Sequence, residues 1–523
     1  MRHRRVRRLA HALCAGLACA GPGAAWAQDG AGPLSSIDWL SDSLAEEAAL
    51  RPLPRAPRDT VGGVRIEAVT VAPLDAPVSD GAGLAGPVET GLPATLWGAG
   101  STDGIAERLA RFPLDGLPAA RDAFRLLLTA RLDPPRGGGT PGTLLLARID
   151  ALLAMGALDE ADALIRAAGA DRPDLFRRAF DIGLLRGSED EGCARLKESP
   201  GIAPSLPVRI FCLARSGDWP AAALTLETAD ALGQLSALED ALLARFLEPE
   251  LAEGVPPLAR LPAPSPLEWR MLEAIGERQP TSGLPRAFAH ADLRETAGWK
   301  TRLEATERLV RAGALPVQAL CTVYTERNAA ASGGIWDRVA AKQAFDAAVA
   351  AGDATGVGAA LRDGWELMAA AGLGLAFAEM TAPHLPRFAL TGEAATLAHR
   401  MHLLARAAAP GIMPPPDTTP TLADRIAVAA PLGEPALSDG DAIRRAVARA
   451  FSEPRPDAPP TVRHLAEWDR LGEALLEALQ IVARGAEADP EDLAGALSFL
   501  RTAGMEETAR RAAIQILLLD GAA

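Results

Sequence analysis

A short pattern recurs along one part of this chain and restricts its fold more than any other feature of the sequence. In each copy a leucine is followed within two to four residues by a glycine, and a small residue stands five positions after that glycine. Such glycines are typical of turns between helices, because glycine adopts a positive φ at no steric cost. The three clear copies are Gly156 with Ala161, Gly187 with Gly192, and Gly217 with Ala222.

The glycines of the three copies are 31 and 30 residues apart, and weaker copies surround Gly313 and Gly504. The pattern resembles the tetratricopeptide class of helical repeats, in which small residues let the chain turn and the two helices approach. The resemblance covers the turn and the start of the second helix, from about Thr143 to Leu224, and the period is shorter than the usual 34 residues. It implies an α-solenoid of antiparallel helix pairs. The alternative is an irregular helical array in which the glycine spacing is coincidental.

The composition also favours helices. Only 4% of the residues are aromatic, and the chain is dominated by Ala, Leu and Arg, which are good helix formers. We therefore expect an all-α protein. The formal net charge is −14, with no basic stripe, which argues against a nucleic-acid partner.

The first 27 residues have the order of a secretory signal peptide. A basic start, Met1–Arg8, precedes an apolar run, Leu9–Ala20, and a small-x-small site at Ala25 and Ala27. We expect cleavage after Ala27 and a periplasmic or secreted protein. We expect no membrane span in the mature chain, since no later apolar stretch reaches the length of one. An uncleaved anchor, a lipoprotein that uses Cys19 and twin-arginine export are weaker alternatives.

Residues 28–103 are rich in Gly, Pro, Ala and Asp, so we expect a largely disordered linker segment. Two short stretches within it differ. Residues 37–44, which include Trp39, favour a short amphipathic helix, and residues 64–71 favour a strand. Both are candidate docking peptides, and the alternative is that they pack back on the chain's own body.

Three cysteines remain after the predicted cleavage: Cys193, Cys212 and Cys321. Cys193 and Cys212 lie at about equal distances from the middle of a Pro-Gly link between two helix-favouring segments, near Ile202. Residues placed in this way in an antiparallel pair face each other, so we predict a Cys193–Cys212 disulfide and a free Cys321. The alternative is two buried thiols.

Motifs of known chemistry are missing: the sequence contains no HExxH, no phosphate-binding glycine loop and no GxSxG elbow. Two places remain as candidates for a pocket. One runs from Tyr324, the single tyrosine, to Asp337 and includes a Ser-Gly-Gly loop; an ordinary interhelical turn explains it equally well. The other is His399 with His402, which share a helix face at i and i+3 but have no obvious third ligand for a metal.

Five segments are therefore expected. They are a signal peptide (1–27), a linker segment (28–103), a helical-repeat domain (104–410), a second linker (411–440) and a C-terminal helical domain (441–523).

The favoured function is a non-catalytic scaffold, without cofactor or metal, that binds a protein or peptide of the cell envelope. The alternative is an envelope enzyme with a pocket near Tyr324–Asp337 or His399/His402. The possible partner-binding residues are Trp39, Tyr324, Glu326, Arg327 and Trp336.

Overall fold

The computed structural model describes residues 79–169, 172–252, 255–405, 419–429, 432 and 440–519. Helices dominate these residues, and no strand occurs among them apart from one isolated bridge between Ala85 and Ala130. The all-α expectation is confirmed. The predicted signal peptide and both candidate docking stretches, with Trp39, lie outside the described residues.

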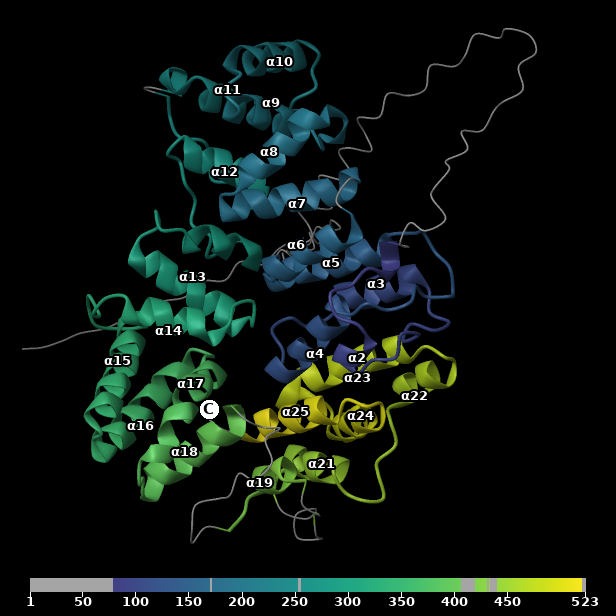
Figure 1. The fold of residues 1–523 in the computed structure, drawn as a ribbon, viewed down its shortest axis with the longest axis vertical. Coiled ribbons are helices and arrows are strands. Elements are labelled where there is room, and N and C mark those ends of the chain that lie inside the picture. Colours follow the sequence, from purple (N-terminus) through teal and green to yellow (C-terminus); the bar gives the residue numbers. More distant parts are fainter. Residues whose placement is uncertain are drawn as a thin grey trace, which may run out of the picture. The chain divides into compact units, whose positions relative to one another are not determined.

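The helices alternate with short turns along the chain (Figure 1). The α-helices are α2 (Pro87–Thr90), α3 (Thr102–Ala110), α4 (Pro118–Thr129), α5 (Thr143–Met155), α6 (Leu158–Ala168), α7 (Pro173–Arg186), α8 (Glu189–Glu198), α9 (Leu206–Arg215), α10 (Trp219–Ala231), α11 (Ala237–Leu247), α12 (Pro266–Ala274), α13 (Trp299–Arg311), α14 (Val317–Thr325), α15 (Ile335–Ala351), α16 (Ala354–Ala370), α17 (Gly374–Thr381), α18 (Gly392–Ala405), α19 (Leu422–Ala427), α21 (Ala442–Ala450), α22 (Pro460–Glu467), α23 (Leu471–Ala483), α24 (Pro490–Thr502) and α25 (Glu506–Leu518). The 3-10 helices are η1 (Ser79–Gly81), η2 (Pro200–Ile202), η3 (Pro249–Ala252), η4 (Arg286–Leu293), η5 (Ala382–Arg387) and η6 (Gly485–Glu487).

The repeat glycines form the turns of three successive helix pairs, α5/α6, α7/α8 and α9/α10. Gly156, Gly187 and Gly217 have φ values of 78°, 78° and 82°, which side chains other than glycine rarely adopt. In each turn the N–H after the glycine donates to a carbonyl five residues earlier, at 2.9, 2.8 and 3.0 Å. This bond is typical of the Schellman cap, and it satisfies a carbonyl at the helix end.

The small residues after these turns lie at close helix contacts. Ala161 and Ala222 are fully buried, and a Cβ placed on Gly192 would lie 2.6 Å from Cδ2 of Phe180. The leucines before the turns are less uniform than the pattern suggests. Leu153 and Leu185 are buried, whereas Leu213 is half-buried, because Phe211, Cys212 and Ala214 take the core positions of α9.

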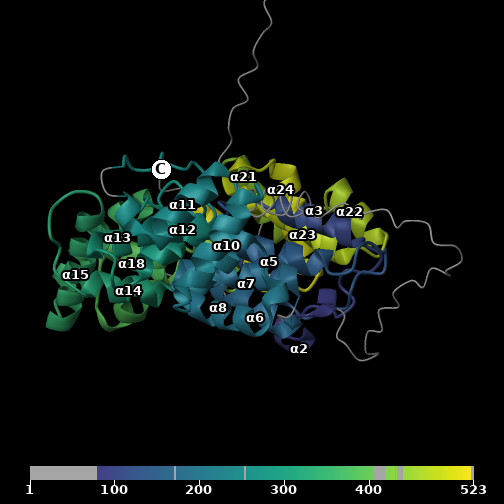
Figure 2. The ribbon, with the colours of Figure 1, turned by 90° about the horizontal axis from the view of Figure 1, so that it is seen from above.

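The C-terminal helices pack against the N-terminal ones, and this departs from an array in which each pair contacts only its neighbours. α23 contacts α3 and α4, and α25 contacts α4, α18 and α19 (Figure 1). Figure 2 also shows α3 beside α23. The backbone N–H of Ala119 donates to Oε1 of Gln515 at 2.8 Å, with both residues buried. Residues 441–519 therefore share one apolar core with α3–α5 and are not packed as a separate domain.

Two segments expected to be linkers also contribute to this core. Residues 79–103 belong to the packed body: Leu96 and Trp97 are each 1% exposed, and Leu96 O accepts from Gly472 N at 2.8 Å. Within 411–440, residues 422–427 form α19, which is buried against α25. The composition of both segments is loop-like, but a few large apolar residues in each are sufficient to attach them to the core.

The predicted disulfide is present. Cys193 on α8 and Cys212 on α9 are bonded, with their Cα atoms 5.0 Å apart, and Cys321 is free. Within the described ranges no helix has both the length and the apolarity needed to cross a membrane.

Candidate functional site

Tyr324 is buried near the end of α14, and its hydroxyl donates to Oε1 of Glu307 on α13. Arg338 on α15 donates to the same carboxylate through Nε at 2.8 Å and Nη2 at 2.6 Å. Burial, followed by the charge of Glu307, raises the pKa of Tyr324 far above its ordinary value. The side chain of Tyr324 thus joins three helices and does not line a surface.

The residues that follow Tyr324 differ from it in exposure. Glu326 and Arg327 are exposed, and Glu326 pairs with Arg302 and, at 3.6 Å, with Arg327. Trp336 at the start of α15 packs on Trp299, with ring centroids 5.1 Å apart. The partner-binding role of these residues stays a prediction. Of the candidates near Tyr324, Glu326 and Arg327 are exposed.

The Ser-Gly-Gly loop before α15 supplies the turn into that helix. Gly333 and Gly334 have φ values of 93° and 58°, and the N–H of Gly333 donates to Oδ1 of Asp337 at 2.9 Å. The carboxylate of Asp337 lies in the first turn of α15, where a negative charge favours the helix dipole.

His399 and His402 do not gather a metal-binding group. Nε2 of His399 pairs with the buried carboxylate of Asp424 on α19. Burial alone would raise the pKa of Asp424, but hydrogen bonds from His399 and Thr421 outweigh it and lower that pKa below its ordinary value. In the part of the chain that the structure describes, no set of three or more His, Cys, Asp or Glu side chains is arranged to hold a metal ion.

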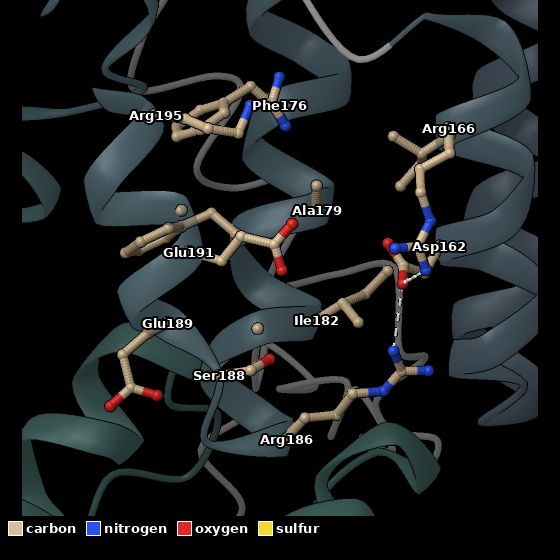
Figure 3. A pocket seen from close by; sticks show the side chains of 14 residues that line it. Asp162, Arg166, Phe176, Ala179, Ile182, Arg186, Ser188, Glu189, Glu191 and Arg195 are labelled. Carbon is tan, nitrogen blue, oxygen red and sulfur yellow. Dashed lines mark hydrogen bonds and ion pairs between the residues drawn. The ribbon is translucent and has the colours of Figure 1, made fainter. Parts of the chain in front are cut away.

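A small pocket lies between α6, α7 and α8, and sequence reasoning did not identify it. It has a volume of about 80 Å³. Arg166 from α6 and Arg186 from the end of α7 both approach Asp162, while Arg195 from α8 lies over the ring of Phe176, 5.4 Å from its centroid (Figure 3). The pocket is thus charged at one side and aromatic at the other.

A row of aromatic rings leads from this pocket to the surface of α10. Phe176 and Phe180 line the pocket, Phe211 contacts Phe180 edge to face at 6.4 Å, and Phe246 stacks on Phe211 at 5.2 Å. Trp219 ends the row, 6.4 Å from Phe246, and 48% of it is exposed.

The exposed side of α10 carries large apolar side chains among polar ones such as Glu227 and Thr228. Leu224 is 64% exposed and Leu232, directly after the helix, is 65% exposed. They lie eight residues apart, so they project from about the same face of the helix. Large exposed apolar side chains that lie near one another are typical of interaction surfaces, whereas single ones are ordinary.

A buried ionic network lies behind the pocket. Oε1 of Glu189, whose side chain is fully buried, accepts from Arg270 on α12 at 2.9 and 3.0 Å. Arg270 also binds Glu273 at 2.5 Å, and Glu273 binds Arg294 at 2.6 Å. In the sequence Glu189 is indistinguishable from a solvated acid in the first turn of a helix, so this network had no detectable sequence signal.

No family model, no curated protein and no solved structure matches this chain. The function therefore has to be argued from the chain's own geometry.

Proposed function

We propose that this chain is a non-catalytic, tetratricopeptide-like helical scaffold of the cell envelope that binds a protein or peptide partner through α7–α10. The carrying observation is the exposure of three large apolar side chains on or directly after one helix: Trp219, Leu224 and Leu232. A helix at the edge of a repeat array needs a polar outer face to remain soluble alone, and α10 has a partly apolar one. A partner that covers this face would remove the apolar area from water.

The repeat and export parts of the proposal have separate support. The three equivalent glycine turns and the buried Ala161 and Ala222 support a tetratricopeptide-like arrangement of α5–α10. The Cys193–Cys212 disulfide supports a compartment outside the cytoplasm, because such bonds persist in oxidising environments. The basic and apolar start of the sequence agrees with export.

No specific observation favours the alternative that the protein is an enzyme. The hydroxyl of Tyr324 donates to Glu307, and Nε2 of His399 pairs with Asp424, so both groups are engaged in contacts between helices.

Site-specific crosslinking of the full chain in its own cells tests the partner role. A photo-crosslinking amino acid at position 224 is expected to capture a discrete protein, and Leu224→Asp, combined with the probe at position 219, is expected to abolish that capture. The matched control is position 468, since Trp468 directly after α22 is distant from α10 in the sequence and is 65% exposed. Equal capture from positions 224 and 468, or none from either, would contradict the proposal.

A further inference from the structure

A second pocket, larger than the first, lies beside η4 and α13 and is not part of the α7–α10 surface. Its volume is about 300 Å³. Its walls come from the loop 278–282, from Ala289 and Asp292 of η4, and from one face of α13. The α13 residues recur at helical spacing and are Thr301, Glu304, Ala305 and Arg308.

Most of the charges around this pocket are already matched. Oδ1 of Asp292 pairs with Arg278, and Oδ2 accepts from the hydroxyl of the buried Thr281. Glu304, at the exposed rim, lies 3.6 Å from Lys300. The two acids that line the pocket therefore each have a cationic partner.

Arg308 is different, because no carboxylate forms an ion pair with it, although the charge of Asp292 in the same pocket acts on it from a greater distance. Nη1 donates to the carbonyl of Thr281 at 2.9 Å and Nη2 donates to the carbonyl of Leu284. Among the described residues no carboxylate lies within ion-pairing distance of this guanidinium. Burial, followed by the positive charge of Arg286, lowers the pKa of Arg308 below its ordinary value. An anion that approaches this half-buried guanidinium would stabilise its charged form.

We propose that this pocket binds a carboxylate group at Arg308, carried either by the free C-terminal end of a peptide or by a small organic acid. A planar guanidinium with two donors already fixed on carbonyls presents its remaining N–H groups in a set orientation, which suits a carboxylate. Pro280, Ala289 and Ala305 provide an apolar wall for a short aliphatic chain. This site is independent of the proposed partner surface on α10.

Calorimetry on the purified chain tests the site with N-acetyl-Ala-Ala, its C-terminal amide, and succinate as probes. The wild type is expected to bind at least one of the two acids and to bind the amide at least tenfold more weakly than the peptide acid. A preference for N-acetyl-Ala-Ala identifies a peptide end as the ligand, and a preference for succinate identifies a free acid. No binding of either acid at millimolar concentration, or equal binding of acid and amide, would overturn the proposal.

Two variants separate binding from folding. Arg308→Gln is expected to weaken binding of the preferred acid at least tenfold, but it also removes two bonds to the loop 281–284. Ala305→Leu leaves Arg308 in place and fills the pocket, so it is expected to abolish binding, and an unchanged helical circular-dichroism spectrum shows that the variant is still folded. The charge control is Arg311→Gln, one helical turn away and outside the pocket, which is expected to change the affinity less than about twofold. Unchanged affinity in Ala305→Leu would contradict the site.

Discussion

Two regions of this protein are held together in different ways. The terminal core, defined as α3–α6 with α19 and α21–α25, is a continuous apolar cluster formed by residues from distant parts of the chain, and it extends to Leu175, Ile182 and Leu185 of α7. The stapled module, defined as α7–α12, has a smaller apolar cluster and a disulfide. Each region also contains a buried carboxylate paired with arginines, Glu189 in the module and Glu473 in the core. A region that packs against helices distant in sequence is stabilised by the apolar area that it buries against them. A region without such packing is stabilised in part by a disulfide and leaves some apolar side chains exposed.

The largest expected effect tests the ionic centre of the terminal core. The carboxylate of Glu473 on α23 is fully buried and binds Arg108 on α3 at 3.0 Å and Arg470 at 2.5 Å. Glu473→Ala removes the buried acid, leaves Arg470 without its carboxylate and leaves Arg108 with Glu477 alone, so we expect a loss of about 3–5 kcal/mol in the free energy of unfolding by urea titration. Glu477→Ala is the matched control, because Glu477 also binds Arg108 but is 26% exposed, and it should cost about 1 kcal/mol or less. Equal losses would show that burial is not the cause.

The next effect concerns the disulfide. Replacing Cys193 and Cys212 by serine opens a loop of 19 residues and is expected to cost about 3 kcal/mol. Hydrogen exchange should locate the loss in α8–α10 and leave α23–α25 protected. Cys321→Ser is the control and should change neither quantity noticeably. If hydrogen exchange in the terminal core became faster by as much as exchange in α8–α10, the two regions would not differ in what stabilises them.

An intermediate effect compares close helix contacts in the two regions. Ala222→Leu in the stapled module and Ala161→Leu in the terminal core both force extra atoms into buried sites and should each cost about 1–3 kcal/mol. The cost should be smaller at Ala222, because α10 contacts mainly α9 and α11 and can shift outward. Ala231→Leu, on the exposed face of α10, is the control and should be close to neutral. The melting temperatures of the three variants give the order of these losses in stability. A larger loss for Ala222→Leu than for Ala161→Leu would show that α10 cannot shift outward to accept the larger side chain.

The sequence predicts local features of this fold better than distant ones. The repeat glycines, the buried Ala161 and Ala222, and the Cys193–Cys212 pair all follow from residues close along the chain. Periodicity identifies the apolar face of a helix but not the helix that covers it. The packing of α25 on α4, with Gln515 bound to Ala119, joins residues almost 400 positions apart and has no local signal.

The candidate sites illustrate the same limit. Tyr324 is unusual in the sequence because it is the single tyrosine, yet its hydroxyl is bound inside the protein. Arg308 is one arginine among many, and its importance depends on which carbonyls and which carboxylates surround it in space. A charge without a partner cannot be recognised from sequence, because the partners come from other elements.

The last expected effect is a pH dependence that belongs to the stapled module and changes stability by only about 1 kcal/mol for each pH unit. Asp181 on α7 is 8% exposed and its Oδ2 has no hydrogen-bond partner. Burial outweighs the nearby charges of Arg177 and Arg178 and raises the pKa of Asp181 from 3.8 to about 7. A raised pKa means that the folded state favours the protonated acid, so this contribution to stability is complete below pH 3.8 and is lost as the pH rises towards 7. Asp181→Asn cannot lose a proton, so the stability of the wild type relative to this variant should fall by about 1 kcal/mol per pH unit within that window. Urea unfolding of both proteins at pH 5, 6 and 7 measures the difference in their free energies of unfolding. If the wild type instead became more stable relative to Asp181→Asn as the pH rose, Arg177 and Arg178 would be stabilising the ionised carboxylate.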